Sequence, residues 1–332
     1  MPSAFGLDSF VSELNQFIFE GLPVRGALVR LTDSWQEILR RRSSNPFSTP
    51  YPIAVQNMLG QMTAAAVLMQ VNIKFNGALI LQIFGDGPVK LAVAEVQADL
   101  SLRATATMLG EVDRDASLAQ MVNQNGQGRC AITLDPKDRL SGQQPYQGVV
   151  PLLDQGGGQH LGPMLQHYMR QSEQLETCLV LAANDTMAAG LLIQRLPLQG
   201  AGNIALDYSS QDEELAEHYL RIATLASSLK SEELLTLDAE TVLRRLFWEE
   251  KIVRFTPDAS QQAPRFACSC SRERVGKMIL GLGLQEAQEI LAERGEIEVA
   301  CEFCGLQYRF DSVDTAYIFK AGPSQPASKV TQ

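Results

Sequence analysis

The chain has 332 residues, which is long enough to bury a large core and would normally divide into two or more domains. Hydrophobic residues make up 45% of it and charged residues 20%, as in ordinary globular proteins. The formal net charge of -10 argues against a nucleic-acid partner, because phosphate binding needs clustered Lys and Arg.

Neither a targeting segment nor a membrane span is expected. Residues 1–8 lack the basic and then apolar pattern of a signal peptide. The apolar stretch over residues 64–84 is interrupted by Gln70, Asn72 and Lys74, among other polar side chains. We therefore expect a cytoplasmic protein, in which thiols stay reduced and close cysteine pairs bind metal or report redox state.

The first predicted elements alternate between strands and helices. Residues 24–31 alternate apolar and polar side chains, which predicts a strand, and Thr32-Asp33-Ser34 predicts the start of a helix. Residues 53–71 carry apolar side chains at three- and four-residue intervals, which predicts a long helix with one buried stripe. Strands over residues 78–84 and 89–96 are joined by Gly85-Asp86-Gly87-Pro88, a turn sequence rather than a phosphate loop.

The next part of the chain completes the first predicted domain. A glycine-rich segment at residues 155–158 precedes a predicted helix through Leu161, Leu165 and Tyr168. It lacks the lysine of a Walker loop, so a flexible connection is favoured over an anion site. Apolar strands are predicted over residues 178–182 and 188–197. Strands and helices mixed with hairpins suggest an α/β or α+β first domain, and we predict α+β with a mixed sheet.

The character of the sequence changes after Pro197. Residues 198–208 are low in charge and contain two glycines, which predicts a linker. Residues 215–229 show a 4-3-4-3 apolar spacing, which predicts a helix with one narrow seam, and a second helix is predicted from near Asp238. Residues 211–250 hold ten acidic and four basic side chains. This pattern is typical of a solvated helical hairpin on the first domain, and the narrow seam also makes it a candidate for detachment.

Four of the six cysteines form two close pairs near the C-terminus, Cys268 with Cys270 and Cys301 with Cys304, separated by 30 residues. A CxC pair and a CxxC pair followed by glycine are typical of zinc knuckles, so we predict that the four thiolates bind Zn2+. The alternatives are scattered core cysteines or a pair of structural disulfides, for which this spacing is unusual.

The remaining candidate ligands do not fit the same pattern. The three histidines, His160, His167 and His218, are distant from the paired cysteines in sequence and have no ligand spacing. Cys130 and Cys178 are predicted to be ordinary apolar core or loop thiols. Coordination by four cysteines alone is therefore the simplest interpretation.

The residues around the cysteine pairs predict a compact module. Short helices are predicted over residues 271–280 and 285–294, the second closed by Gly295, followed by strands over 296–300 and 307–310 and a last helix capped by Asp311. A core of about 55 residues rarely supplies more than roughly 3 to 5 kcal/mol, whereas structural zinc contributes on the order of 10 to 16 kcal/mol. We therefore expect the module to unfold when it loses its metal.

Oxidation of the cysteines is one way in which the module can lose its metal. Each neighbouring pair can close on itself into a very small ring, which is worth only about 1.5 to 2 kcal/mol and does not replace the metal. Arg272 and Arg274 are available to offset the negative charge of a four-thiolate centre, or they are plain solvated helix residues.

The two cysteine motifs, Cys268-Ser269-Cys270-Ser271-Arg272-Glu273-Arg274-Val275 and Cys301-Glu302-Phe303-Cys304-Gly305, resemble the zinc centre of the redox-regulated heat-shock chaperonins of thirty-three kilodaltons. The similarity extends through nearly the whole chain. Further matching stretches are Val24-Arg25-Gly26, Gly85-Asp86-Gly87-Pro88, Tyr146-Gln147-Gly148-Val149-Val150, Gln171-Ser172-Glu173-Gln174-Leu175, Gln194-Arg195-Leu196-Pro197 and residues 243–250.

The resemblance implies an ATP-independent holdase that is inactive when reduced and zinc-bound. In that family oxidation forms disulfides between near neighbours, here Cys268 with Cys270 and Cys301 with Cys304. Zinc leaves, the adjoining linker unfolds, and the protein forms a homodimer that binds unfolding client proteins. The resemblance thus implies a chaperone with no enzymatic activity, no nucleic-acid or membrane partner, and a role in the stress response.

The implied organisation has four parts: an α/β core for client binding and dimerisation at residues 1–197, a metastable helical linker at 198–264, a zinc-binding redox switch at 265–320, and a disordered tail at 321–332.

Three other functions remain as alternatives. Cys301-Glu302-Phe303-Cys304 is a CxxC sequence, as in thiol-disulfide oxidoreductases, but these place the motif at a helix start and need no CxC partner. A zinc-ribbon nucleic-acid binder is disfavoured, because residues 266–320 hold nine acidic and six basic side chains. A constitutive structural zinc module without a switch stays open on the sequence alone.

Overall fold

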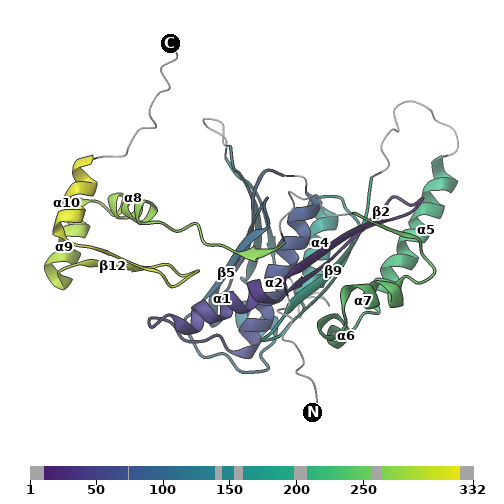
Figure 1. The fold of residues 1–332 in the computed structure, drawn as a ribbon, viewed down its shortest axis with the longest axis horizontal. Helices are drawn as coiled ribbons and strands as arrows, with labels where there is room; N and C mark the ends of the chain where they lie inside the picture. Colours follow the sequence, from purple (N-terminus) through teal and green to yellow (C-terminus); the bar gives the residue numbers. More distant parts are fainter. Residues whose placement is uncertain are drawn as a thin grey trace, which may run out of the picture. The chain divides into compact units, whose positions relative to one another are not determined.

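The protein is described by a computed structural model that covers residues 11–73, 75–138, 144–152, 160–197, 208–255 and 263–321, without the side chains of 208–212 and 321. These residues form two compact units (Figure 1). The larger unit, here called the body, comprises the described residues within Met1–Arg40 and Pro50–Ala267, and the smaller one those within Arg41–Thr49 and Cys268–Gln332. The predictions for residues 155–158 and 198–207, and for the tail after residue 321, lie outside the described residues.

An antiparallel five-stranded sheet forms one layer of the body. Its strand order is β10-β1-β2-β9-β8. Alternation along β2 sends Val29 and Leu31 to one face and Val24 and Leu28 to the other, so that both faces are apolar and both are covered. The strands are β1 Glu13–Phe19, β2 Val24–Leu31, β8 Thr177–Ala183, β9 Ala188–Arg195 and β10 Ile252–Arg254.

A six-stranded sheet forms a second layer, in the order β11-β5-β4-β3-β6-β7. It is mixed, because β11 runs parallel to β5 while the other pairs are antiparallel. The predicted hairpin is present, with β3 and β4 joined at Gly85-Asp86-Gly87-Pro88. The strands are β3 Gly77–Phe84, β4 Val89–Gln97, β5 Ser101–Met108, β6 Arg129–Pro136, β7 Tyr146–Pro151 and β11 Arg265–Phe266.

The long helix α2, Ile53–Asn72, packs against strands of both sheets and shares one core cluster with them (Figure 1). The helix is confirmed, but the prediction of a single buried stripe is wrong, because Ala64, Ala65, Ala66, Val67 and Leu68 are all fully buried. Its position between two apolar sheet faces explains why successive residues on every side avoid water. The other helices of this region are α1 Asp33–Ser44, α3 Leu118–Val122 and α4 Leu161–Ser172.

The outer face of the five-stranded sheet is covered by what we call the helical segment: α5 Tyr208–Ser227, α6 Ser231–Thr236 and α7 Ala239–Leu246 (Figure 1). Buried side chains of α5 follow the predicted seam, with Tyr219, Ile222 and Ala226 packed on the sheet. Asp238 caps α7 by accepting a hydrogen bond from the Thr241 N–H at 2.9 Å, as predicted. The predicted hairpin of two helices is incomplete, since the short α6 lies between them.

The smaller unit contains α8 Arg272–Leu282, α9 Leu284–Arg294, β12 Ile297–Ala300, β13 Gln307–Phe310 and α10 Ser312–Ala321. We call the part from Cys268 to Ala321 the cysteine module. Its predicted elements are present: Gly295 ends α9 in the left-handed conformation at φ +80°, and β12 and β13 pair as an antiparallel hairpin. Asp311 caps α10, because its Oδ1 accepts from the N–H groups of Val313 and Asp314. The predicted α+β class with mixed sheets is confirmed.

Within the described ranges, none of the helices combines the length and the apolar character needed to span a bilayer.

Candidate metal centre

The CxC pair is held between two elements. Cys268 and Cys270 follow β11 closely, and Ser271 caps α8 by accepting a hydrogen bond from the Arg274 N–H at 3.2 Å. The start of α8 thus fixes the chain directly after Cys270. The sulfurs of Cys268 and Cys270 both lie within 4.8 Å of those of the second pair.

The CxxC pair lies in the turn between β12 and β13. The Cys301 N–H donates to the Leu306 carbonyl at 2.9 Å, and the Gly305 N–H donates to the Cys301 carbonyl at 2.8 Å. Gly305 has φ +71°, a conformation that side-chain-bearing residues rarely adopt, and this explains the glycine after the motif. The turn is therefore a closed knuckle that holds Cys301 and Cys304 in fixed positions.

The four sulfurs converge. All four Sγ atoms lie within 4.8 Å of one another, with 3.7 Å between Cys268 and Cys301 and 3.3 Å between Cys270 and Cys304. Ligands at the usual zinc–sulfur distance in a tetrahedron would be about 3.8 Å apart, close to these separations. The structure thus brings together the four predicted cysteines, each offering one sulfur to a site that could hold a metal ion.

Backbone groups of the knuckle favour the charged form of these thiols. Backbone N–H groups of Phe303 and Cys304 hydrogen-bond the Cys301 sulfur, and that of Leu306 bonds the Cys304 sulfur, and each lowers the thiol pKa. Without a cation, the effects that raise the thiol pKa values are larger than these hydrogen bonds. The hydrogen bond with Cys268 and then burial raise the pKa of Cys301, and burial raises the pKa of Cys304 to about 11. A bound metal ion would offset the effects that raise these pKa values, because a metal deprotonates a coordinating thiol.

Neighbouring side chains support the cluster. The Tyr308 hydroxyl donates to the Cys270 sulfur at 3.2 Å. Arg274 donates to both the carbonyl and the hydroxyl of Ser269, at 2.9 and 2.7 Å, and so braces the residue between the two first cysteines. The guanidinium of Arg274 is therefore close to the site, which agrees with the interpretation that it offsets the negative charge of the cysteine cluster.

Arg272 has a different role. It donates to the Arg309 carbonyl and to Asp314, and its guanidinium carbon lies 4.2 Å from the centre of the Phe310 ring. Its charge is thus already paired with a carboxylate. Of the two arginines, Arg274 is the one placed at the cysteine motif, whereas Arg272 ties α8 to β13 and α10.

The apolar core beneath the cluster is small. Five buried hydrophobic residues form it: Ile279, Ala287, Ile297, Tyr308 and Phe310. Partly buried side chains around them, Cys270 among these, complete the packing. A core of this size contributes only a few kcal/mol to the stability of the fold. We therefore expect the module to depend on its sulfur cluster for stability.

The other two cysteines lie in the body and are separate from the cluster. Cys130 is fully buried in β6, and burial raises the pKa of its thiol to about 12. Cys178 is buried in β8, where burial raises its pKa and its sulfur lies 3.3 Å from the Ser227 hydroxyl of α5. Both are inert core thiols, as predicted.

Tyr308 is the functional residue that the sequence analysis did not single out. Strand alternation offered a signal, because Tyr308 and Phe310 share one face of β13, four and six residues beyond Cys304. The three histidines are positioned elsewhere, His160 and His167 at α4 and His218 on α5. They are not among the residues that the structure brings to the sulfur cluster.

These features define a class: an α+β protein with two packed sheets, a helical segment on one of them, and a C-terminal four-cysteine module. Comparison with known proteins agrees with it. The family model described as Hsp33 protein matches residues 12–311. The "33 kDa chaperonin" of Chromobacterium violaceum is 44% identical over 307 residues, which cover 92% of this chain and 93% of that protein.

A second relative, the "33 kDa chaperonin" of Neisseria meningitidis serogroup B, is 42% identical over 92% of this chain and 90% of its own length. The crystal structure of the 33 kDa chaperonin of Thermotoga maritima has a similar fold, with a TM-score of 0.70 at 20% identity over 93% of this chain and 98% of that one. The chain belongs to the Hsp33 family, and the predicted resemblance is confirmed.

Proposed function

We propose that this protein is a redox-regulated, ATP-independent chaperone of the holdase type, which is inactive while its four cysteines are reduced and bind zinc. Family membership and relatives named as chaperonins support the chaperone part. The observation that carries the redox part is the convergence of four sulfurs within 4.8 Å in a module with a small apolar core. Such a module can be unfolded by chemistry at its sulfurs alone.

In the reduced state Cys268, Cys270, Cys301 and Cys304 would hold the ion. The separations of the sulfurs and the N–H groups that point at Cys301 and Cys304 fit a four-thiolate zinc site. Bound zinc would supply cohesion, on the order of 10 to 16 kcal/mol, rather than a reaction. The Tyr308 hydroxyl would orient the Cys270 sulfur and stabilise its negative charge.

Oxidation removes the ligands. We propose the pairing of near neighbours, Cys268 with Cys270 and Cys301 with Cys304. Each pair of zinc-bound thiolates gives up two electrons to one peroxide molecule, which takes two protons from the solvent and is reduced to two waters. One sulfur–sulfur bond forms in each pair, the zinc–sulfur bonds break, and Zn2+ leaves. The resulting rings are very small, and each is worth only about 1.5 to 2 kcal/mol. The module is left with its small core and unfolds.

Unfolding next reaches the helical segment, in our proposal, and the apolar sheet face below it then becomes available. That face carries large buried side chains such as Phe17, Phe19 and Leu191. Exposed apolar area of this kind is what binds unfolding proteins. The same proposal assigns client binding to residues 1–197, the linker to 198–264 and the switch to 265–320. It also includes a homodimer in the oxidised state.

The oxidoreductase alternative finds less support. Cys301 and Cys304 lie in a strand-to-strand knuckle, whereas a thioredoxin-like motif begins a helix after a strand. Cys304 is buried and its pKa is raised by burial, the opposite of an activated nucleophile. A constitutive structural zinc protein shares the whole site geometry and differs only in its response to oxidant.

The test compares reduced protein with protein treated with peroxide at raised temperature. We expect stoichiometric zinc and no suppression of client aggregation before treatment, and zinc release with strong suppression after it. Hydrogen exchange should lose protection from about residue 211 onward. Unchanged zinc together with activity in the reduced state would remove the switch, and catalytic turnover of a model disulfide would favour the oxidoreductase.

A further inference from the structure

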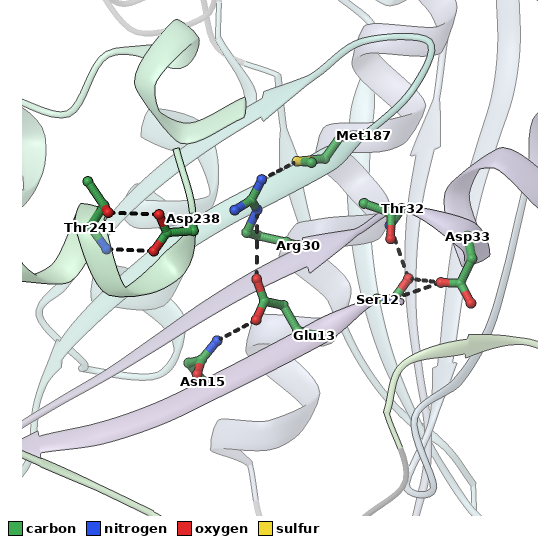
Figure 2. A network of polar contacts seen from close by, with 9 residues as sticks. All are labelled: Ser12, Glu13, Asn15, Arg30, Thr32, Asp33, Met187, Asp238 and Thr241. Atoms are coloured by element: carbon green, nitrogen blue, oxygen red, sulfur yellow. Dashed lines mark hydrogen bonds and ion pairs between the residues drawn. The ribbon is translucent and has the colours of Figure 1, made fainter. Parts of the chain in front are cut away.

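The outer face of the five-stranded sheet is largely apolar, with Arg254 at its edge paired to Glu240 of α7, and a further group of polar side chains lies at one end. There Glu13, Asn15 and Arg30 gather on neighbouring strands β1 and β2 (Figure 2). Strand alternation places Arg30 on the same face as Leu28, which packs under the helical segment. Arg30 is only 8% exposed. A guanidinium is therefore buried in the layer between the sheet and the helices.

The guanidinium of Arg30 is weakly hydrogen-bonded, although it forms a long ion pair with Glu13. Its Nε atom lies 3.9 Å from Glu13 Oε1, too far for a hydrogen bond, and is buried without a hydrogen-bond partner. Its Nη2 atom donates to the Met187 sulfur at 3.5 Å, and a thioether is a weak acceptor. Burying a charge without strong hydrogen bonds is unfavourable, because the protein does not replace the water that the charge has lost.

The helical segment brings one carboxylate to this guanidinium. Asp238, the N-cap of α7, lies beside Arg30 in Figure 2. Both oxygens of Asp238 are engaged by Thr241, through its N–H at 2.9 Å and its hydroxyl at 2.7 Å. These hydrogen bonds and, to a smaller extent, the charge of Arg30 lower the pKa of Asp238. The carboxylate therefore acts on Arg30 through space while its hydrogen bonds serve the helix.

We propose that Arg30 is a built-in destabilising charge, which keeps the docking of α6 and α7 on the sheet weak. When the helices separate from the sheet, the guanidinium regains water, and this gain offsets part of the lost apolar contact. The same position with an apolar side chain would dock the helices more tightly. Weak docking can be measured in the reduced protein, and only its link to client binding rests on the proposed function.

The first test replaces Arg30 by an unbranched apolar side chain, Arg30→Met. Amide hydrogen exchange in α6 and α7 is measured on the reduced, zinc-loaded full chain. We expect exchange about tenfold slower or more, because removing one buried donor without a hydrogen-bond partner is worth on the order of a kcal/mol or above. Arg129→Met is the matched control, since Arg129 is an exposed residue of β6 in the other sheet and the change in net charge is the same.

Faster or unchanged exchange in Arg30→Met would overturn the proposal, because Arg30 would then be an anchor or a bystander. A chain that does not fold would count against it too, since the proposal requires that the sheet accept an apolar side chain here. Asp238→Asn provides an independent test, because asparagine caps helices as well as aspartate. Its oxygen can still accept from the Thr241 N–H and its NH2 can donate to the Thr241 hydroxyl, so both contacts are kept while the charge is lost.

Asp238→Asn should speed exchange in α6 and α7 in the natural background and leave it unchanged in the Arg30→Met background. An equal effect in both backgrounds would show that Asp238 does not act through Arg30 and would contradict the proposal. Aggregation suppression after peroxide is measured in parallel. Slower exchange with activation by peroxide unchanged would support the docking inference and contradict the detachment step of the proposed function.

Discussion

The body and the cysteine module reach stable folds by different means. In the body, α2 and two sheets enclose a core with fully buried Trp35, Leu59, Met62 and Leu68, among many others. In the module the described core has five buried hydrophobic residues, and one of them, Tyr308, also contacts a cysteine sulfur. Burial of apolar surface can hold the body together without help. The difference predicts that chemistry at the sulfurs would unfold the module and leave the core around α2 folded.

The strongest test of this contrast removes one sulfur. Cys301→Ser should abolish stoichiometric zinc binding and unfold the module, a loss on the order of 10 kcal/mol, because three thiolates do not complete the site. Zinc content and hydrogen exchange of residues 268–321 check this. Cys130→Ala in the body is the control and should keep both zinc and module protection. A protected module in Cys301→Ser would break the comparison.

A core substitution in the body should have the converse effect. Met62→Ala, in the fully buried middle of α2, should cost about 2 to 5 kcal/mol of the unfolding free energy of the body. Denaturant unfolding measures this cost, and hydrogen exchange of the module should stay the same. Ile53→Ala, at the start of α2 where the side chain is 42% exposed, serves as the control with a change near zero. Loss of module protection in Met62→Ala would mean that the two units unfold as one.

A substitution next to the sulfurs should act on metal retention. Tyr308→Phe removes the hydroxyl that donates to Cys270 and keeps the ring in the core, so zinc affinity should fall about 10- to 100-fold. Competition with a chromogenic chelator measures the affinity. Tyr317→Phe on α10, where the side chain is 72% exposed, should bind zinc like the natural protein. Equal affinities in the two variants would show that the Tyr308 hydroxyl does not support the cluster.

The smallest expected effect compares the same change in both units. Ser271→Ala removes the cap of α8 and Ser117→Ala the cap of α3, and each should cost about 0.5 to 2 kcal/mol. Only Ser271→Ala should speed zinc release to a chelator, because Ser271 directly follows Cys270. Release at the natural rate in Ser271→Ala would show that the helix start does not position the CxC pair.

Local patterns in the sequence were enough to predict the hairpin of β3 and β4, the helices α2 and α8, and the sulfur cluster. The hairpin and the helices depend on residues near one another in the chain. The sulfur cluster depends on cysteines, whose paired spacing is typical of metal ligands. The convergence of the two cysteine motifs could be predicted without tertiary information, since a four-cysteine metal site would need both motifs. The convergence of their sulfurs follows the prediction closely.

Long-range pairing could not be predicted in the same way. The strand β10, Ile252–Arg254, is three residues long and pairs with β1, and β11 is only two residues long and pairs with β5. Segments this short have no periodicity of their own. Arg30 is a further example, because a polar residue alternating with apolar ones predicts a solvated side chain, whereas the helical segment covers it. Three successive alanines in α2 were a signal for burial on all sides that the stripe interpretation missed.

The geometry of the sulfurs makes the outcome of oxidation depend on which partners join. In the folded module the close sulfur pairs at 3.7 and 3.3 Å run between the motifs, Cys268 with Cys301 and Cys270 with Cys304. A covalent bridge between Cys268 and Cys301 would enclose the two helices α8 and α9 in one loop and constrain the unfolded chain by about 4 kcal/mol, roughly twice the effect of either small ring. Such a bridge would favour the folded form of the cysteine module. Under the proposed function, unfolding of the module therefore needs a disulfide within each motif.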